Sequence, residues 1–395
     1  MKKQSITILW PEHNPLEVEE FIYSISFCQA KSKELCSGTG LKIDWTSYKM
    51  TSSMAEIISG VESDFLLLIS DPELILSAQA VLAMVQSIVS GTTAIGPVYN
   101  LTDFPNQQAN LPAPYLNTTG FDELVRYNYE HENKKNKTTD QLDPSCILYP
   151  AEFLKSLTND QFSVSPIDFS KHPYPKEICN RALVHRFGNY YDGERPDLVA
   201  LIPERVKSIL DVGTAMGGYG RGLKKERPEI ILSGVETNSL MAQNAEKYYD
   251  RIHIGKVEDI LFDEQFDLIN CGDVIEHLYD PWQTLDQLFN LIKPGGYLLL
   301  SVPNVGHWSI ALDLLKGKFD YIPVGIQCIT HIRWFTEQSI KTALKNSGFE
   351  IDIFHRQQHA PTPDGENFIR KMMETGFGNE QSLLANEFII RAVKK

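Results

Sequence analysis

Paired cysteines and long apolar runs are both missing from this sequence. Its six cysteines are scattered without a CxxC pair, which excludes a small disulfide-stapled domain and a zinc site built from closely spaced thiolates. No stretch approaches the roughly 18 consecutive apolar residues that a membrane-spanning helix needs. The apolar run before Pro11 is too short for the core of a signal peptide. These absences predict reduced thiols, no membrane span and a cytoplasmic location.

Positive charge is also in deficit. Lys and Arg number 37 against 51 Asp and Glu, so the net charge is -14, and a nucleic-acid groove is not expected on such a surface. The composition is 42% hydrophobic and 22% charged, which is typical of globular proteins. A chain of 395 residues is long enough for two hydrophobic cores, so we expect two domains.

The stretch from Val206 to Gly220 predicts a site for a nucleotide-type cofactor. It begins as an apolar strand suited to burial on both faces and then turns through small residues into a helix. Gly213, Ala215 and Gly217 would let the backbone approach a ligand closely. A dinucleotide fingerprint GxGxxG is the competing interpretation, with Gly213, Ala215 and Gly218 in the three places. The loop alone fits either class of cofactor.

The order of motifs downstream separates the two classes. A strand from Ile231 to Val235 ends on Glu236, and the segments FDLINCGDVIEHL, DPWQTLDQLFNLIKPGGYLLLSVPN and THIRWFT follow. In this order the second half resembles the class I S-adenosylmethionine-dependent methyltransferases. The resemblance implies an α/β fold with a Rossmann-like sheet of seven strands over residues 191–395, and S-adenosyl-L-methionine as the cofactor.

The same resemblance implies the cofactor contacts. The candidates in the glycine loop and after the following strands are Asp211, Gly213, Ala215, Gly217, Glu236, Thr237, Val257, Glu258, Cys271 and Asp273. Lys256 stands where many members carry an adenine-binding aspartate, so Glu258, Asp259 or the backbone of Val257 is expected to replace it. Tyr191 and Arg195 fall where family members fold a lid over the cofactor, although packing between domains is the alternative.

Two histidines are candidates for the chemistry. Methyl transfer from a sulfonium needs alignment of the reactants and, for a hydroxyl acceptor, removal of a proton. His277 and His331 are the candidate bases, although His277 could instead hydrogen-bond a neighbouring loop. Some relatives with an acid, two intervening residues and then Glu-His bind a divalent ion there. The matching positions are Asp273, Glu276, His277 and His331, and no metal is assigned to them.

The first half shows a β-α-β-β-α-β pattern. Apolar strands are predicted at Ile6–Trp10, Leu41–Trp45, Phe65–Ile69 and Thr93–Val98. With the turn Asp71-Pro72-Glu73 after the third strand, residues 1–190 resemble the GT-A-like nucleotide-sugar domain of family 2 glycosyltransferases, in which a DxD pair holds a divalent ion. Alternatively, Asp71 caps a helix that runs through Leu76. The second acidic pair of that family is incomplete here, so we expect a degenerate domain.

Acceptor choice follows from the fusion of these two halves. The predicted function is O-methylation of a sugar hydroxyl in polysaccharide or surface glycan biosynthesis. The alternatives are a small-molecule O- or N-methyltransferase and a non-catalytic scaffold that binds the cofactor. The expected partners are a glycan or small-molecule acceptor and no nucleic acid, with a homodimer possible. The domain boundary is expected within residues 172–196. The long insert at residues 359–384 is expected to add either a helix near the active-site mouth or a contact to the N-terminal domain.

Overall fold

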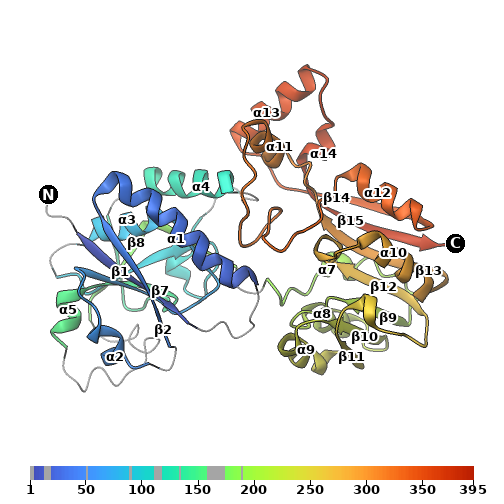
Figure 1. The fold of residues 1–395 in the computed structure, drawn as a ribbon, viewed down its shortest axis with the longest axis horizontal. Helices are drawn as coiled ribbons and strands as arrows, with labels where there is room; N and C mark the ends of the chain where they lie inside the picture. The colour runs from blue at the N-terminus through green and yellow to red at the C-terminus, as the bar shows by residue number, and fades with distance from the viewer. Residues whose placement is uncertain are drawn as a thin grey trace. The chain divides into compact units, whose positions relative to one another are not determined.

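The chain divides into two compact units. The computed structural model describes residues 4–12, 19–49, 52–88, 91–110, 118–132, 135–157, 174–187 and 190–395. The first unit is Met1–Gly188 with Tyr321–Gly325, and the second is Asn189–Asp320 with Ile326–Lys395. Part of the predicted boundary segment lies outside the described residues. Each unit contains its own sheet (Figure 1).

The first unit is built on a mixed sheet. Its strands are β1 (Ser5–Pro11), β2 (Lys42–Tyr48), β3 (Phe65–Ile69), β4 (Leu74–Leu76), β5 (Ala94–Tyr99), β6 (Lys137–Thr139), β7 (Cys146–Pro150) and β8 (Lys176–Arg186). Its α-helices are α1 (Glu19–Thr39), α2 (Met54–Ser59), α3 (Ala78–Ser87), α4 (Thr118–His131) and α5 (Ala151–Lys155). The strand order is β2-β1-β3-β7-β5-β8-β4, with β6 paired to β8. Strand β7 runs antiparallel between β3 and β5, whereas β1 is parallel to both β2 and β3.

The predicted strands of the first unit are present, but the helix after the acidic turn starts later than expected. Leu74–Leu76 forms β4, which pairs antiparallel with β8. Helix α3 begins only at Ala78, where the hydroxyl of Ser77 accepts a hydrogen bond from the backbone N–H of Ala80 at 3.0 Å. The interpretation that Asp71 caps this helix is therefore wrong. The buried apolar run between the turn and Ser77 is stabilised by pairing in the sheet.

The second unit contains the predicted sheet of seven strands. Its strands are β9 (Ser208–Val212), β10 (Ile231–Glu236), β11 (Arg251–Ile254), β12 (Phe266–Gly272), β13 (Ile292–Pro303), β14 (Phe349–Gln358) and β15 (Ala385–Lys394). Its α-helices are α7 (Pro196–Val199), α8 (Gly218–Glu226), α9 (Ser239–Ala245), α10 (Pro281–Leu291), α11 (Trp308–Leu315), α12 (Glu337–Asn346), α13 (Pro363–Glu374) and α14 (Glu380–Leu384). The order is β11-β10-β9-β12-β13-β15-β14. The five strands from β9 to β13 are parallel, and β15 is antiparallel to both β13 and β14.

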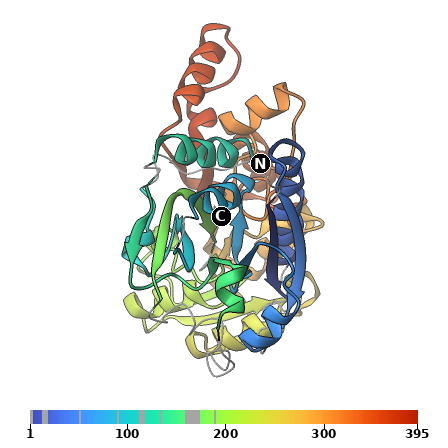
Figure 2. The same ribbon diagram turned by 90° about the vertical axis from the view of Figure 1, so that its left-hand side faces the viewer.

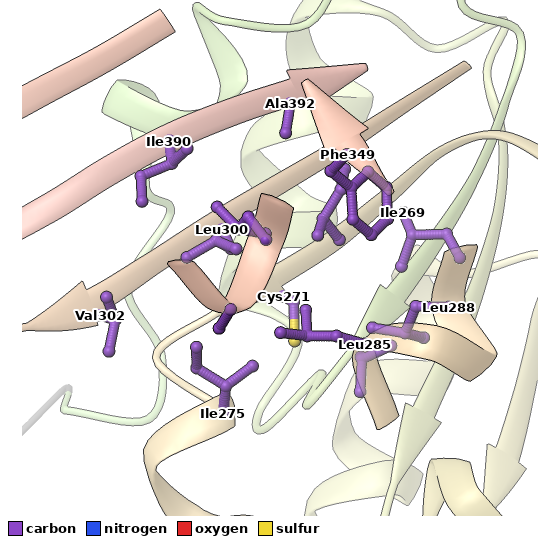
Figure 3. Close-up of a cluster of buried hydrophobic side chains, with 14 of the residues drawn as sticks. Ile269, Cys271, Ile275, Leu285, Leu288, Leu300, Val302, Phe349, Ile390 and Ala392 are labelled. Carbon is purple, nitrogen blue, oxygen red and sulfur yellow. The ribbon is translucent and has the colours of Figure 1, made fainter. Parts of the chain in front are cut away.

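Alternating side chains of these strands face two apolar layers. Ile209 and Leu268 pack with residues of α7, α8 and α9. Their neighbours Leu210 and Ile269 pack on the other face with residues of α10 and α12 (Figure 3). A sheet covered on both faces leaves the carboxyl ends of its parallel strands as the place for a ligand.

Three helices form a small group at that edge. Helix α11 follows the carboxyl end of β13, while α13 and α14 lie in the insert between β14 and β15 (Figures 1 and 2). Trp308 of α11 packs with Phe368 and Ile369 of α13 and with Leu383 of α14. The insert therefore supplies two helices where one was predicted.

Two findings concern the predicted absences. Within the part of the chain that the structure describes, no helix has both the length and the apolar content required to cross a membrane. The five cysteines whose side chains are described are all buried thiols.

Candidate cofactor and methyl-transfer site

The turn after β9 has no space for a side chain at two of its glycines. Gly213 has φ +80°, and a Cβ built on it would lie 2.6 Å from Cγ2 of Val274. Gly217 has φ +88°, and a Cβ there would lie 2.8 Å from Cα of Ala245. The hydroxyl of Thr214 is buried without a hydrogen-bond partner, which is uncommon unless a ligand satisfies it. The loop thus presents close backbone and one unsatisfied hydroxyl.

Ala215 is the strained member of this turn. Its φ is +46°, a region in which a residue with a Cβ costs about 1–2 kcal/mol. Its backbone N–H donates to Oε2 of Glu236 at 2.8 Å. Such strain persists only where the surroundings hold it, which is common at functional sites.

The carboxylate of Glu236 lies at the end of β10, as predicted. Besides Ala215, it accepts from the backbone N–H of Asn238 at 2.8 Å and from the hydroxyl of Thr237 at 3.3 Å. These donors fix its orientation. Oε1 accepts two of them and Oε2 accepts one, so a lone-pair site remains on Oε2. A carboxylate in this place can accept hydrogen bonds from ribose hydroxyls.

Both carboxylate oxygens of Asp211 have hydrogen-bond partners inside the second unit. Asp211 is almost fully buried, and it accepts hydrogen bonds from the hydroxyl of Tyr249 and, at 2.7 Å, from the side-chain amide of Asn270. Burial raises the pKa of Asp211 to about 7. Its role toward a ligand is therefore indirect, through the position of the loop.

The segment before α7 lies directly against the glycine turn. The backbone carbonyl of Tyr191 accepts a hydrogen bond from the N–H of Met216 at 2.9 Å. A Cβ on Gly218 would lie 2.4 Å from the carbonyl carbon and oxygen of Asp192. Because Gly218 has no side chain, the segment before α7 can approach the start of α8. The segment is close enough to the glycine turn to act as a lid.

Replacing Gly218 by alanine is expected to displace the segment. Backbone atoms at 2.4 Å cannot give way cheaply, so Gly218→Ala should lower stability by about 1–3 kcal/mol and weaken binding of S-adenosylhomocysteine at least tenfold. Gly193→Ala is the matched control, because a Cβ on Gly193 meets nothing within 4 Å. Thermal unfolding and isothermal titration calorimetry measure both effects. Equal behaviour of the two variants would remove the lid role.

Three predicted cofactor contacts, Val257, Glu258 and Cys271, differ in whether their side chains are accessible to a ligand. Val257 is packed in the apolar layer, so only its backbone is available. Glu258 lies beside it in a single 3-10 turn, Val257–Asp259, and is half-buried. The sulfur of Cys271 is fully buried among apolar side chains (Figure 3). This corrects the expectation that the thiol faces the cleft, because the side chain of every second strand residue points into the core.

Asp273 and Arg195 are joined to each other and to a residue that the sequence analysis missed. Arg195 forms ion pairs with Asp197 at 2.9 Å, with Glu387 at 2.8 Å and with Asp273. Burial, followed by the charge of Asp273, raises the pKa of Glu387 to about 8. A signal for Glu387 was present in the sequence. An antiparallel last strand starts at the edge where the parallel strands end, so an acid at its start faces the site.

The two histidines come together with a glutamate. The rings of His277 and His331 are perpendicular, with centroids 4.8 Å apart. Nδ1 of His277 lies 3.1 Å from the carbonyl oxygen of Thr330, and Nδ1 of His331 lies 2.8 Å from that of Ile326. If both Nδ1 atoms donate, each Nε2 carries a lone pair. Within the described residues, Glu276, His277 and His331 form a group whose candidate ligand atoms all lie within 4.8 Å of one another.

Glu276 makes this group chemically unusual. It is almost fully buried, and both of its carboxylate oxygens lack a hydrogen-bond partner. Burial raises the pKa of Glu276 well above its ordinary value, and burial lowers the pKa of His331 to about 4. Without a cation, Glu276 is therefore either protonated or a buried carboxylate that lacks hydrogen bonds. One carboxylate and two imidazoles fit a divalent transition metal better than magnesium.

The acidic turn of the first unit is paired internally. Oδ2 of Asp71 accepts a hydrogen bond from Nε of Arg186 at 2.7 Å, and Oδ1 accepts from the N–H of Glu73 at 2.8 Å. The same guanidinium donates to Asp143 at 3.3 Å and to the hydroxyl of Ser145 at 2.9 Å. The guanidinium of Arg186 therefore lies where a cation between these acids would be placed.

Comparison with known proteins settles the class of the second unit. Residues 183–352 match a family described as a methyltransferase domain. The second unit contains a class I S-adenosylmethionine-dependent methyltransferase domain. The close-packed turn at Gly213, the unsatisfied hydroxyl of Thr214 and the oriented Glu236 lie together after β9 and β10 and are compatible with such a cofactor.

Relatives of the methyltransferase domain are named for different activities. A probable S-adenosylmethionine-dependent methyltransferase of Mycolicibacterium smegmatis is 26% identical over 156 residues, which cover 38% of this chain and 56% of that protein. A ubiquinone biosynthesis O-methyltransferase of Hydrogenovibrio crunogenus is 24% identical over 154 residues, with 36% and 61% covered. A solved S-adenosylmethionine-dependent methyltransferase of Thermotoga maritima, described as a possible histamine N-methyltransferase, is 20% identical with a TM-score of 0.37, covering 52% of this chain and 89% of that one. The match spans about 56% and 61% of the length of the two curated relatives.

Proposed function

We propose that this protein transfers the methyl group of S-adenosylmethionine to a hydroxyl group. The observation that carries this proposal is the meeting of the Gly213 turn and Glu236 at the carboxyl edge of the sheet, in a unit that contains a methyltransferase domain. The bound cofactor would supply an activated methyl group. The residues of the chain have to orient it, exclude water and deal with the proton of the acceptor.

Different parts of the edge would bind different parts of the cofactor. The turn from Gly213 to Gly217 would lie along the methionine end, and Glu236 would accept from the ribose. The backbone at Val257 and the side chain of Glu258 would face the adenine. Arg195 offers a guanidinium for the cofactor's carboxylate.

The proton of the acceptor would be handled at the histidine group. Nε2 of His277 or of His331 could accept it directly. Alternatively, Glu276, His277 and His331 would hold a divalent ion, which lowers the pKa of a bound hydroxyl. The unpartnered carboxylate of Glu276 favours the second arrangement.

For the acceptor we propose a sugar hydroxyl of a polysaccharide or surface glycan. The support is the fusion to a first unit with an antiparallel β7 between β3 and β5 and an acidic turn after β3, features that suit the GT-A-like resemblance. Because Arg186 already neutralises Asp71, this unit would recognise or position the glycan without transferring sugar.

A small-molecule hydroxyl is the second candidate acceptor. The relatives named as ubiquinone biosynthesis O-methyltransferases favour it, including one of Coxiella burnetii that is 30% identical over 132 residues. Both acceptors would be methylated from the same cofactor site. They differ in the acceptor pocket beyond the sulfur, and the fold alone does not determine which acceptor that pocket binds.

Binding and labelling experiments test the proposed function in sequence. Calorimetry should detect S-adenosylmethionine and S-adenosylhomocysteine, whereas binding of NAD without either would contradict the cofactor assignment. Incubation with methyl-labelled cofactor and either a cell-envelope extract or a panel of phenolic acceptors should then move label to one of them. Label that stays on the cofactor in both would indicate a non-catalytic scaffold.

A further inference from the structure

Arg195 is held by three carboxylates from distant parts of the chain. Nε and Nη2 donate to Asp197, Nη1 donates to Asp273 and Nη2 donates to Glu387 at 2.8 Å. Asp197 lies two residues along, but Glu387 is 192 residues away on β15. One guanidinium thus faces three acidic side chains.

The two edges of this guanidinium are used differently. The Nε side receives both oxygens of Asp197 at 3.1 and 3.3 Å. The outer side, made of Nη1 and Nη2, is shared between Asp273 and Glu387. A planar pair of N–H donors matches a single carboxylate with two parallel hydrogen bonds. Two side chains that each take one donor therefore occupy the place of one bidentate ligand.

Asp273 and Glu387 are not equally attached. Oδ1 of Asp273 accepts from the hydroxyl of Ser301 at 2.8 Å, and the backbone N–H of Asp273 donates to the hydroxyl oxygen of Ser301 at 3.0 Å. The carboxylate of Glu387 has Arg195 as its one hydrogen-bond partner among the described residues. The side chain of Arg195 is 24% exposed and that of Glu387 is 18% exposed, so a ligand can reach this edge. Glu387 is the side chain that can leave.

We propose that Glu387 is a built-in competitor for the carboxylate of the cofactor at the outer edge of Arg195. This inference rests on the proposed function, since it requires that S-adenosylmethionine binds beside the glycine turn. Arg195 is near that turn because the carbonyl of Tyr191 bonds the N–H of Met216. The cofactor's carboxylate takes the Nη2 donor that Glu387 leaves, while Asp273 stays on Nη1, and Glu387 turns toward the acceptor side. The competition sets cofactor affinity below what Arg195 alone would give.

Glu387→Gln tests the competition, because it keeps the size of the side chain and removes the acidic group. Binding is measured at pH 8.5, where the carboxyl of Glu387, with a pKa of about 8, is mostly ionised. The variant should bind S-adenosylhomocysteine about three to tenfold more tightly. It should bind 5′-methylthioadenosine, which has the nucleoside and thioether but no carboxylate, with unchanged affinity. Calorimetry with both ligands separates a charge effect at Arg195 from a general change in the site.

Arg195→Gln completes a double-mutant cycle with Glu387→Gln. In an Arg195→Gln background the same Glu387→Gln change should give no gain in S-adenosylhomocysteine affinity, because the contested donor is gone. A gain that persists without Arg195, or an equal change for both ligands, overturns the proposal. So does unchanged or weaker binding of S-adenosylhomocysteine by Glu387→Gln while the wild type binds it. Failure of the wild type to bind either ligand would instead overturn the proposed function, and with it this inference.

Discussion

Gly213→Val is expected to abolish binding of S-adenosylmethionine and S-adenosylhomocysteine. The left-handed conformation, φ +80°, costs about 1–2 kcal/mol for a residue with a Cβ and is least favourable for a β-branched one. The new side chain would also meet Val274 at 2.6 Å. Each 1.4 kcal/mol is a factor of ten in affinity, so we expect a loss of at least a hundredfold by calorimetry.

Ala215→Gly is the matched control in the same turn. At φ +46° the alanine already bears the left-handed cost of about 1–2 kcal/mol, which glycine removes. The extra freedom of glycine in the unfolded chain costs about 0.4–1 kcal/mol. The control should therefore keep its stability and its affinity. Circular dichroism establishes that both variants are folded, and a folded Gly213→Val protein with normal affinity would remove the turn from the cofactor site.

The parallel half of the second unit could be predicted because its signals are local. A strand that is apolar on both faces, followed by glycines and then by an acid at the end of the next strand, specifies a ligand edge by itself. Gly213, Ala215, Gly217 and Glu236 all lie at that edge. The same reasoning does not give the orientation of a residue such as Cys271, because a shift of one position along a strand moves a side chain to the other face.

Contacts between distant segments could not be predicted. Glu387 reaches Arg195 across 192 residues, and Arg186 reaches Asp71 across 115. Neither spacing has a sequence signature, because strand order and tertiary pairing determine it. The turn at Asp71 also shows the limit of local rules. A Pro after an Asp is a good helix start, but pairing of Leu74–Leu76 with β8 overrides it.

The buried carboxylate of Glu276 leads to the second prediction with a large effect, a bound divalent ion. Its oxygens have no hydrogen-bond partner, and an unpaired carboxylate in such a place costs several kcal/mol if it is ionised. The nearby imidazoles of His277 and His331 complete a set of three candidate ligands. We expect the protein to bind Mn²⁺ or Zn²⁺, and Glu276→Gln, which keeps the shape and removes the charge, to lose that binding.

Removal of the ion distinguishes the two arrangements for the proton. If the ion acts on the acceptor hydroxyl, chelator treatment should lower methyl transfer at least a hundredfold while S-adenosylhomocysteine still binds. Added metal should then restore wild type but not Glu276→Gln. If a histidine acts as the base, the chelator should have no effect, and His331→Ala alone should lower the rate by about 10² to 10⁴. The metal content of the purified protein, measured together with the rate, decides between the two arrangements. If active protein contains no metal, the ion does not act on the acceptor hydroxyl.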